Sequence, residues 1–575
     1  MPNPQASRSK NEWTPRPWQA LLLALATAAV AFAVYIPSFN HKFLDWDDQG
    51  TVATNPDFNP PDAGKWGHYW TGAYLELYMP LTYMFWGSVA NSAYDPNSTP
   101  HLDPAVFHCA SAALHGLCAA MVFLVLLRLA RKPAPAILGA AVFALHPLQV
   151  ESVDWVTSTS NLLSGFLSLI VIWNYLRFDE LISAEADLLA APPAGRTGRD
   201  RNSDVIPSQS SVKAWLFFSA GSIAFALALL SKPSAVMVPI LIALMLIGLR
   251  RRRVLSLWPL LIWLLMSIAM AVVTRLVQAA AAIHVSLTDR ILVAIDAIAF
   301  YISKLFWPAH LIPDYGRTPA WVMAHPASHW IWALPAILLL LCVIFWKRAR
   351  WLATSAAVFV VALVPVLGLA VFTYQKYSTV ADRYVYLSML GPAIALAFVA
   401  TYWRAKWTWI ASACLAICLG TLTVIQSHYW FDTVTLFQHT LTINPRSIAA
   451  NDALGHWYEQ HGEPQRGLAY YQAALETNPH YGNVLYNAGN ALMRLNRPKD
   501  AIDYYRRAAT DSDLEPSVKA QAWDNMGVAE VLLGDFAAAE RSFQSALEQD
   551  SSYKPAQDHL SKIRVRMQIR SSSQR

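Results

Sequence analysis

The chain changes character near residue 427. Before that point apolar stretches recur, and many of them reach the roughly 20 residues that a helix needs to cross a bilayer. After it the sequence is polar and has almost no long apolar run. With 55% apolar and 14% charged residues over 575 positions, the chain is unlike an average soluble protein and too long for one core. We expect an all-α fold, in which a polytopic membrane helix bundle precedes a soluble helical domain.

The apolar stretches predict eleven membrane crossings. They lie at about residues 17–37, 106–127, 134–150, 155–176, 214–231, 233–249, 254–276, 330–346, 351–373, 384–402 and 407–426. Lys and Arg gather in every second loop, which predicts that the N-terminus is cytoplasmic. An odd number of crossings then places the loop after the first crossing and the C-terminal domain together on the other face.

Two segments need separate treatment. Residues 288–308 are apolar enough to cross, but a crossing there would invert the sidedness of everything downstream. Asp296 and Lys304 within this segment suit an interfacial or re-entrant helix on the outer face. Residues 180–212 are rich in Ala, Pro, Gly, Ser and Arg, which predicts a cytoplasmic linker without structure.

The C-terminal part is repetitive. Leu454-Gly455, Ala488-Gly489 and Met526-Gly527 recur at a spacing of about 34 residues, with an insertion near Asp511 before the third copy. Each copy is followed by aromatic and small residues, a pattern that resembles the tetratricopeptide repeat and predicts pairs of helices. We assign residues 1–427 to the membrane domain, 428–565 to the repeats and 566–575 to a disordered tail. Such arrays usually bind peptides, although an array can also serve only as a scaffold.

An acidic loop follows the first crossing. Asp47 and Asp48 are adjacent, and because neighbouring carboxylates repel, one of them can hold a proton more tightly and act as a general base. Together with Asp45 they could instead hold a divalent cation. A solvated acidic loop without chemistry is an equally good interpretation of these residues alone.

Other polar residues are predicted on the same outer face. His146 and Glu151 lie in the next outer loop, where they could orient a substrate, although a His-Pro pair is also common at a helix end. Lys232 and Arg383 are cations on the face that should be poor in positive charge. They could bind a lipid phosphate, or simply extend toward the headgroups. Tyr384 could stack on a sugar or belong to the aromatic belt of the membrane.

Several classes of function are disfavoured. The net charge of +6 is small for this length and does not indicate nucleic-acid binding. All five cysteines lie in apolar stretches and show no metal-ligand or redox spacing. No glycine-rich phosphate loop or dinucleotide fingerprint is present.

Seven short motifs occur in a fixed order. They are LDWDD (44–48), Tyr78 with Pro80-Leu81, Phe107-His108 with His115, ALHPLQVE (144–151), LSKP (230–233), YISKLFWP (301–308) and ADRYVYL (381–387). Followed by tetratricopeptide-like repeats, this order resembles the transmembrane and tetratricopeptide-repeat O-mannosyltransferases, and more closely their bacterial relatives, within the GT-C superfamily. The match covers nearly the whole chain.

The resemblance implies a polyprenyl-phosphate-linked sugar as donor and an acceptor presented in the periplasm or lumen. It places the catalytic acidic motif on Asp47 and Asp48 and makes Arg383 a contact to the donor phosphate. We propose Lys232, less directly, for the same role. Two departures stand out: the family often has Arg where this chain has Met79, and a basic segment where this chain reads TSTSN at 157–161. The donor can therefore differ from that of the eukaryotic enzymes, and activity can have been lost.

We therefore expect an inverting glycosyltransferase of a bacterial inner membrane, with the repeats on the periplasmic side holding a protein acceptor. Two alternatives stay open. The chain could be a non-catalytic scaffold in which the membrane part anchors the repeats. It could also transfer an oligosaccharide, or modify a lipid or glycan acceptor instead of protein hydroxyl groups.

Overall fold

The computed structural model describes residues 15–75, 77–190, 209–250, 252, 257–277, 285–325, 328–512 and 514–573. Across these residues every regular element is helical, and the only β-type pairing consists of isolated bridges such as that between Tyr94 and Leu102. The all-α class predicted from the sequence is confirmed.

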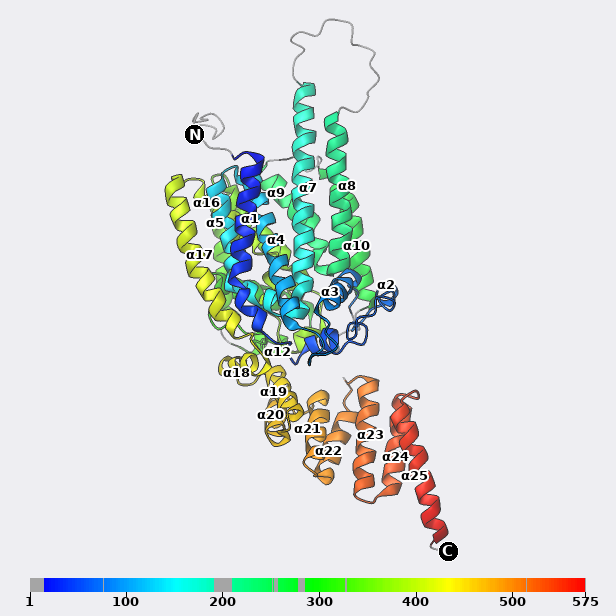
Figure 1. Ribbon diagram of the computed structural model, residues 1–575. Helices are drawn as coiled ribbons and strands as arrows, with labels where there is room; N and C mark the ends of the chain where they lie inside the picture. Colours follow the sequence, from blue (N-terminus) through cyan, green and yellow to red (C-terminus); the bar gives the residue numbers. More distant parts are fainter. Residues whose placement is uncertain are drawn as a thin grey trace.

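The first part of the chain forms a helical bundle (Figure 1). Its elements are α1 (Pro17–Val34), α2 (His68–Thr71), α3 (Pro80–Ala93), α4 (Pro104–Ala130), α5 (Pro133–Leu145), α6 (Val150–Asp154), α7 (Thr159–Ala190), α8 (Gln209–Ser231), α9 (Val238–Gly248), α10 (Leu260–Val277), α11 (Leu287–Phe306), α12 (Pro319–Ala324), α13 (Ser328–Ile331), α14 (Ala333–Ile344), α15 (Arg350–Leu363), α16 (Leu390–Ala400) and α17 (Ala405–His428). Large apolar side chains such as Leu265, Leu339 and Ile417 point outward from it. An exposed apolar surface of this kind suits lipid and indicates that the chain associates with a membrane.

Six helices in the described part of the chain are long and apolar enough to cross a bilayer, or seven if the bent pair 133–145 and 147–154 counts as one crossing. The prediction of eleven crossings is therefore confirmed only in its coarser form, a polytopic bundle. Four further apolar helices, at 233–248, 333–344, 350–366 and 390–400, fall where other crossings were predicted but are short. The apolar stretches there are broken by irregular backbone, for example the 3₁₀ turns Pro233–Met237 and Val364–Val366. A count of apolar residues does not see such breaks.

Small residues let the bundle helices pack backbone against backbone. A Cβ added at Gly139 of α5 would lie 2.4 Å from the carbonyl oxygen of Ala393 in α16. A Cβ at Gly391 of α16 would lie 2.5 Å from the carbonyl oxygen of Ser355 in α15. Helix pairs inside a membrane gain from this close approach, because dispersion contacts replace the hydrophobic effect as the main attraction.

The second part of the chain is a row of antiparallel helix pairs. It comprises α18 (Thr433–Ile443), α19 (Ile448–Gln460), α20 (Pro464–Thr477), α21 (Gly482–Arg494), α22 (Pro498–Ala509), α23 (Pro516–Leu532), α24 (Phe536–Gln549) and α25 (Lys554–Ser573). The recurring glycine has a structural reason: the rings of Tyr471, Tyr505 and Phe543 pack against Gly455, Gly489 and Gly527 in successive pairs. Helix α25 runs on to Ser573, through most of the stretch for which the sequence predicts a disordered tail.

The row of pairs extends from one end of the bundle (Figure 1). The start of α1, the end of α7 and the start of α8 lie at the opposite end of the bundle. Within the predicted linker, α7 continues to Ala190 and α8 begins at Gln209, so both ends of that stretch are helical. Residues 191–208 lie outside the described residues.

Helix α11 corresponds to the segment that resisted a spanning assignment, and it is not among the six helices that qualify as crossings. Its Asp296 accepts two hydrogen bonds from Nη2 of Arg317, at 2.6 and 2.7 Å. Its Lys304 donates to the backbone carbonyl of Ala309 at 2.6 Å. Both charged side chains are thus satisfied locally, in the loop that follows the helix.

Candidate functional site

The acidic loop begins after α1 and the short 3₁₀ turn Ile36–Asn40. Asp48 is buried there and its carboxylate is already in use. Oδ2 accepts a hydrogen bond from the backbone N–H of Leu44 at 3.1 Å, and Oδ1 accepts one from the backbone N–H of Thr157 at 2.9 Å and another from the Thr157 hydroxyl. Burial raises the pKa of Asp48 to about 6 against the opposite effect of these bonds. The side chain holds the loop against the start of α7.

Asp47, by contrast, has its side chain open to solvent. Protein mass around it still raises its pKa, and the positive charge of Arg383 offsets part of that rise. An accessible carboxylate with a raised pKa and a nearby cation suits general-base chemistry. Of the two aspartates for which the sequence predicts catalysis, Asp47 has an accessible carboxylate, whereas the carboxylate of Asp48 is bound within the fold.

The predicted alternative of a divalent cation concerns the ligands near Asp47 and Asp48. No group of three or more His, Cys, Asp and Glu side chains able to hold a metal ion exists among the described residues. Both carboxylate oxygens of Asp48 face N–H and O–H donors, which compete with a cation for the same lone pairs.

Arg383 lies in the short 3₁₀ turn Asp382–Val385 and is buried. Glu151 of α6 accepts from the Arg383 backbone N–H at 2.9 Å and pairs with its guanidinium through Nη1. Three rings surround the cation, with centroids at 5.0 Å for Trp155, 4.3 Å for Tyr374 and 4.9 Å for Tyr384. The predicted residues Arg383, Glu151 and Tyr384 therefore form one cluster, in which a carboxylate and aromatic faces orient the guanidinium.

Lys232 follows the last residue of α8, and its Nζ donates to Oδ1 of Asn161 at 2.6 Å. The pKa of Lys232 is lowered to about 7, chiefly by burial and also by the charge of Arg383, while the charge of Glu151 acts in the opposite direction. These electrostatic effects mean that Lys232 belongs to the same cluster as Arg383. A phosphate beside it would favour the charged form of the amine.

His146 does not join the cluster. It sits at the break between α5 and α6, where Nδ1 accepts from the backbone N–H of Leu148 at 3.2 Å and Nε2 lies 3.1 Å from the carbonyl oxygen of Leu305. Both ring nitrogens are occupied by backbone groups. The alternative interpretation, a histidine at a helix end, describes this residue.

Several residues of the cluster were missed or undervalued from the sequence. Trp155 contacts both the acidic loop and Arg383: its ring is stacked on that of Trp46 with centroids 4.9 Å apart, and the guanidinium lies over the same ring. The TSTSN segment, noted only for lacking basic residues, supplies Thr157 to Asp48 and Asn161 to Lys232. Met79, which stands where the family often has Arg, packs among buried apolar side chains. Trp46 stands inside the LDWDD motif, whereas Trp155 lies in none of the seven motifs, so only the first of these two rings carried a signal in the sequence.

The acidic loop also touches the helix pairs. The backbone N–H of Asp45 donates to Oγ1 of Thr433 in α18 at 2.8 Å, and Nδ1 of His456 in α19 lies 2.7 Å from Oδ2 of Asp45. Nearby, the hydroxyl groups of Tyr377 and Tyr481 are hydrogen-bonded across the same junction. The cluster and the C-terminal array therefore meet at one end of the bundle.

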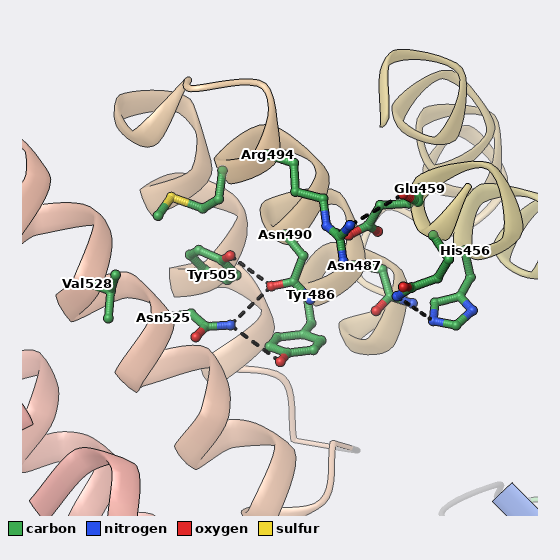
Figure 2. A pocket seen from close by; sticks show the side chains of 11 residues that line it. His456, Glu459, Tyr486, Asn487, Asn490, Arg494, Tyr505, Asn525 and Val528 are labelled. Carbon is green, nitrogen blue, oxygen red and sulfur yellow. Dashed lines mark hydrogen bonds and ion pairs between the residues drawn. The ribbon is translucent and has the colours of Figure 1, made fainter. Parts of the chain in front are cut away.

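A groove of about 420 Å³ runs along the array beside this junction (Figure 2). Hydrogen bonds tie neighbouring pairs along its wall: Asn490 accepts from Tyr505 at 2.8 Å and from Asn525 at 3.0 Å. Arg494 pairs with Glu459 at 2.9 Å. The remaining amide groups of the asparagines offer both donors and acceptors, as an extended polypeptide backbone requires.

Comparison with known proteins addresses the array first. Residues 453–516 match the tetratricopeptide repeat family. The chain contains tetratricopeptide repeats.

Two curated proteins are similar to part of the chain. Tetratricopeptide repeat protein 8 of Caenorhabditis elegans is 26% identical over 135 residues, which cover 24% of this chain and 26% of that protein. The human protein O-mannosyl-transferase TMTC3 is 26% identical over 137 residues, which cover 22% of this chain and 15% of that protein. The chain thus matches about a quarter or less of the length of each relative.

Two solved structures resemble parts of the chain. One is described as the functional characterization of Pseudomonas aeruginosa pilF; it is 22% identical, with 27% of this chain and 67% of that chain covered and a TM-score of 0.23. The other is the crystal structure of the APC/C hetero-tetramer Cut9-Hcn1; it is 12% identical, with 76% and 93% covered and a TM-score of 0.22.

Proposed function

We propose that this chain is a membrane glycosyltransferase of the GT-C type, which moves a sugar from a polyprenyl-phosphate-linked donor to a hydroxyl group of a protein held by the tetratricopeptide array. The observation that carries the proposal is the convergence of Asp47, the Arg383–Glu151 pair and Lys232 at the end of the bundle that the array contacts. The local similarity to TMTC3, which is named as a protein O-mannosyl-transferase, supports the same class of reaction.

In the proposed reaction the carboxylate of Asp47 takes the proton of the acceptor hydroxyl. The hydroxyl oxygen forms a bond to the anomeric carbon, and the bond from that carbon to the donor phosphate oxygen breaks. The phosphate leaves with the electron pair as the polyprenyl phosphate, and the configuration at the anomeric carbon inverts. Because a phosphate is a good leaving group, cations that stabilise its charge replace a general acid.

Arg383 and Lys232 are the cations proposed for this role. A guanidinium has five N–H donors, and Glu151 binds the side chain through Nη1, so further donors remain for phosphate oxygens. Glu151 and the rings of Trp155 and Tyr374 fix the orientation of the group before the donor arrives. Such preorganised charge is usually the largest single contribution to catalysis.

We further propose a bacterial inner-membrane location, a cytoplasmic N-terminus and a periplasmic array. The start of α1 lies at the bundle end opposite the array, which supports this topology because an odd number of crossings would give such an arrangement (Figure 1). Under this arrangement the donor reaches the cluster from the outer leaflet, where Trp and Tyr side chains are common.

The test compares exported proteins of wild-type and deletion strains by mass spectrometry of their glycans, with Asp47→Ala as the variant. We expect that the deletion and Asp47→Ala both remove the same hexose-sized mass from Ser or Thr residues. A mass of several sugars would instead assign the transfer of a preassembled oligosaccharide. Unchanged protein glycans with an altered lipid or surface glycan would assign a non-protein acceptor.

A non-catalytic scaffold is the second candidate, and a specific observation favours it: Asp48, Glu151, Arg383 and Lys232 all have partners within the chain. In that case the membrane part only anchors the repeats. Residues 430–575 tethered by a single unrelated membrane helix would then restore the phenotype of the deletion strain. Restoration by full-length chain alone, and not by the tethered array, would exclude the scaffold.

A further inference from the structure

The acidic loop is held from the array side as well as from the bundle side. Besides the bond from the Asp45 N–H to Thr433, the ring of Trp46 packs edge-on against Phe437 of α18, with centroids 5.6 Å apart. On the next helix, His456 of α19 reaches Oδ2 of Asp45 at 2.7 Å. Only Trp46 separates Asp45 from Asp47, so the position of the array bears directly on that of the proposed base.

His456 has a second face. The side chain is 42% exposed and lines the groove of the array together with Glu459, Asn487 and Arg494 (Figure 2). One imidazole therefore contacts both the acidic loop and the surface that would hold a polypeptide. No other residue of the described groove lining makes a hydrogen bond to the acidic loop.

The charges around His456 connect it to the groove wall. Three carboxylates act on its ring: Asp45 across the junction, and Asp452 and Glu459 on its own helix. The two on α19 are each bound by a residue of α21, since Asn487 donates to Asp452 at 3.0 Å and Arg494 pairs with Glu459 at 2.9 Å. A polypeptide that binds Asn487 or Arg494 would change the electrostatic field of Asp452 and Glu459 at His456. The strength of the contact between His456 and Asp45 would change with it.

We propose that His456 is a positioning residue that couples occupancy of the array groove by a polypeptide to the placement of the acidic loop. A segment seated beside His456 and Arg494 would fix the loop, and with it Asp47, when an acceptor is present. The inference rests on the proposed function for its purpose, but the coupling itself is a property of the contacts between α21, α19 and the loop. A coupling of this kind between sites commonly amounts to about five- to 150-fold in an equilibrium constant.

The experiment measures amide hydrogen exchange of residues 42–49 in the full-length protein in lipid nanodiscs, without substrate. We expect His456→Ala to speed exchange at Asp45 about tenfold. His456→Asn should keep exchange near the wild-type rate, because its amide nitrogen can donate to Asp45 from the position of Nδ1. The matched control is His461→Ala on the same helix, whose ring contacts Trp457 and not the loop.

The coupling is tested with a double-mutant cycle. Arg494→Ala, on the groove wall and away from the loop, should change loop exchange about threefold when His456 is present and leave it unchanged in the His456→Ala background. Asn525→Ala, one repeat farther along the groove, should have no effect in either background. An equal effect of Arg494→Ala in both backgrounds, or wild-type exchange in His456→Ala, would overturn the proposal.

The two proposals fail separately. Because exchange is followed without donor or acceptor, loss of the coupling leaves the transferase assignment standing. Conversely, unchanged glycans in the deletion strain would remove the transferase assignment, while the link between groove and loop could still be measured.

Discussion

The adjacent residues Asp47 and Asp48 have different surroundings in the structure, and a pair of substitutions tests whether their roles differ as well. Asp47→Ala removes an exposed carboxylate that takes part in no hydrogen bond described for the loop. Asp48→Ala removes the acceptor for the backbone N–H groups of Leu44 and Thr157 and for the Thr157 hydroxyl. The first change should act on chemistry and the second on the fold of the loop.

The size of the second effect follows from the two orphaned backbone donors. A buried N–H group left without an acceptor costs about 1–3 kcal/mol, so two cost about 2–6 kcal/mol. Water entering the space left by the carboxylate reduces this cost toward the lower value. At about 2 kcal/mol, the equilibrium for local opening shifts about thirtyfold, since 1.4 kcal/mol corresponds to a factor of ten.

Amide exchange at Leu44 and Thr157 is the direct assay, followed in purified protein by mass spectrometry. We expect exchange about thirtyfold faster in Asp48→Ala and unchanged in Asp47→Ala. Transfer of sugar should show the complementary pattern: removal of a general base costs about 10²- to 10⁴-fold in rate. Wild-type exchange in Asp48→Ala would refute the hydrogen-bond argument, and full transfer in Asp47→Ala would refute the role of the base.

Three further predictions concern the surroundings. Glu151→Gln leaves the buried Arg383 cation unpaired, at a cost of about 3–5 kcal/mol, and should lower the thermal unfolding temperature in detergent. The double variant with Arg383→Met should recover most of this loss of stability. A double variant as unstable as Glu151→Gln alone would contradict this account. Gly391→Ala forces α15 and α16 apart and should lower the free energy of unfolding by about 1–3 kcal/mol, seen in the same assay. Gly50→Ala is the control, because its new Cβ meets no atom within 4 Å and should change the stability little. Equal unfolding temperatures of the two variants would refute the close packing. Asp45 raises the pKa of His456 above 6.5, so the stabilisation from their pair is complete below pH 6.5 and is lost as the pH rises through the higher folded-state pKa. Amide exchange at Asp45, corrected for its intrinsic pH dependence, should therefore accelerate over that range in wild type but not in His456→Ala. Parallel pH profiles of exchange in the two proteins would contradict this prediction.

Much of the fold could be predicted from residue patterns. Periodic small and aromatic residues predicted the helix pairs, because each Gly at 455, 489 and 527 must admit a ring from the next helix. Long apolar stretches predicted a polytopic bundle. The number of crossings could not be predicted in the same way, since the 3₁₀ turns at Pro233–Met237 and Val364–Val366 interrupt the α-helices at positions where the sequence stays apolar.

The candidate site divides in the same manner. The sequence alone indicated the residue types: paired aspartates, two cations on a face poor in them, and a glutamate in a short loop. Only the tertiary structure decided that Glu151 pairs with Arg383, that Asp48 is bound by Thr157, and that His146 serves the backbone. The partners in these contacts are up to 232 residues apart along the chain. Local pattern fixes periodicity and polarity, but a hydrogen bond between distant residues depends on how the helices pack, which no local pattern records.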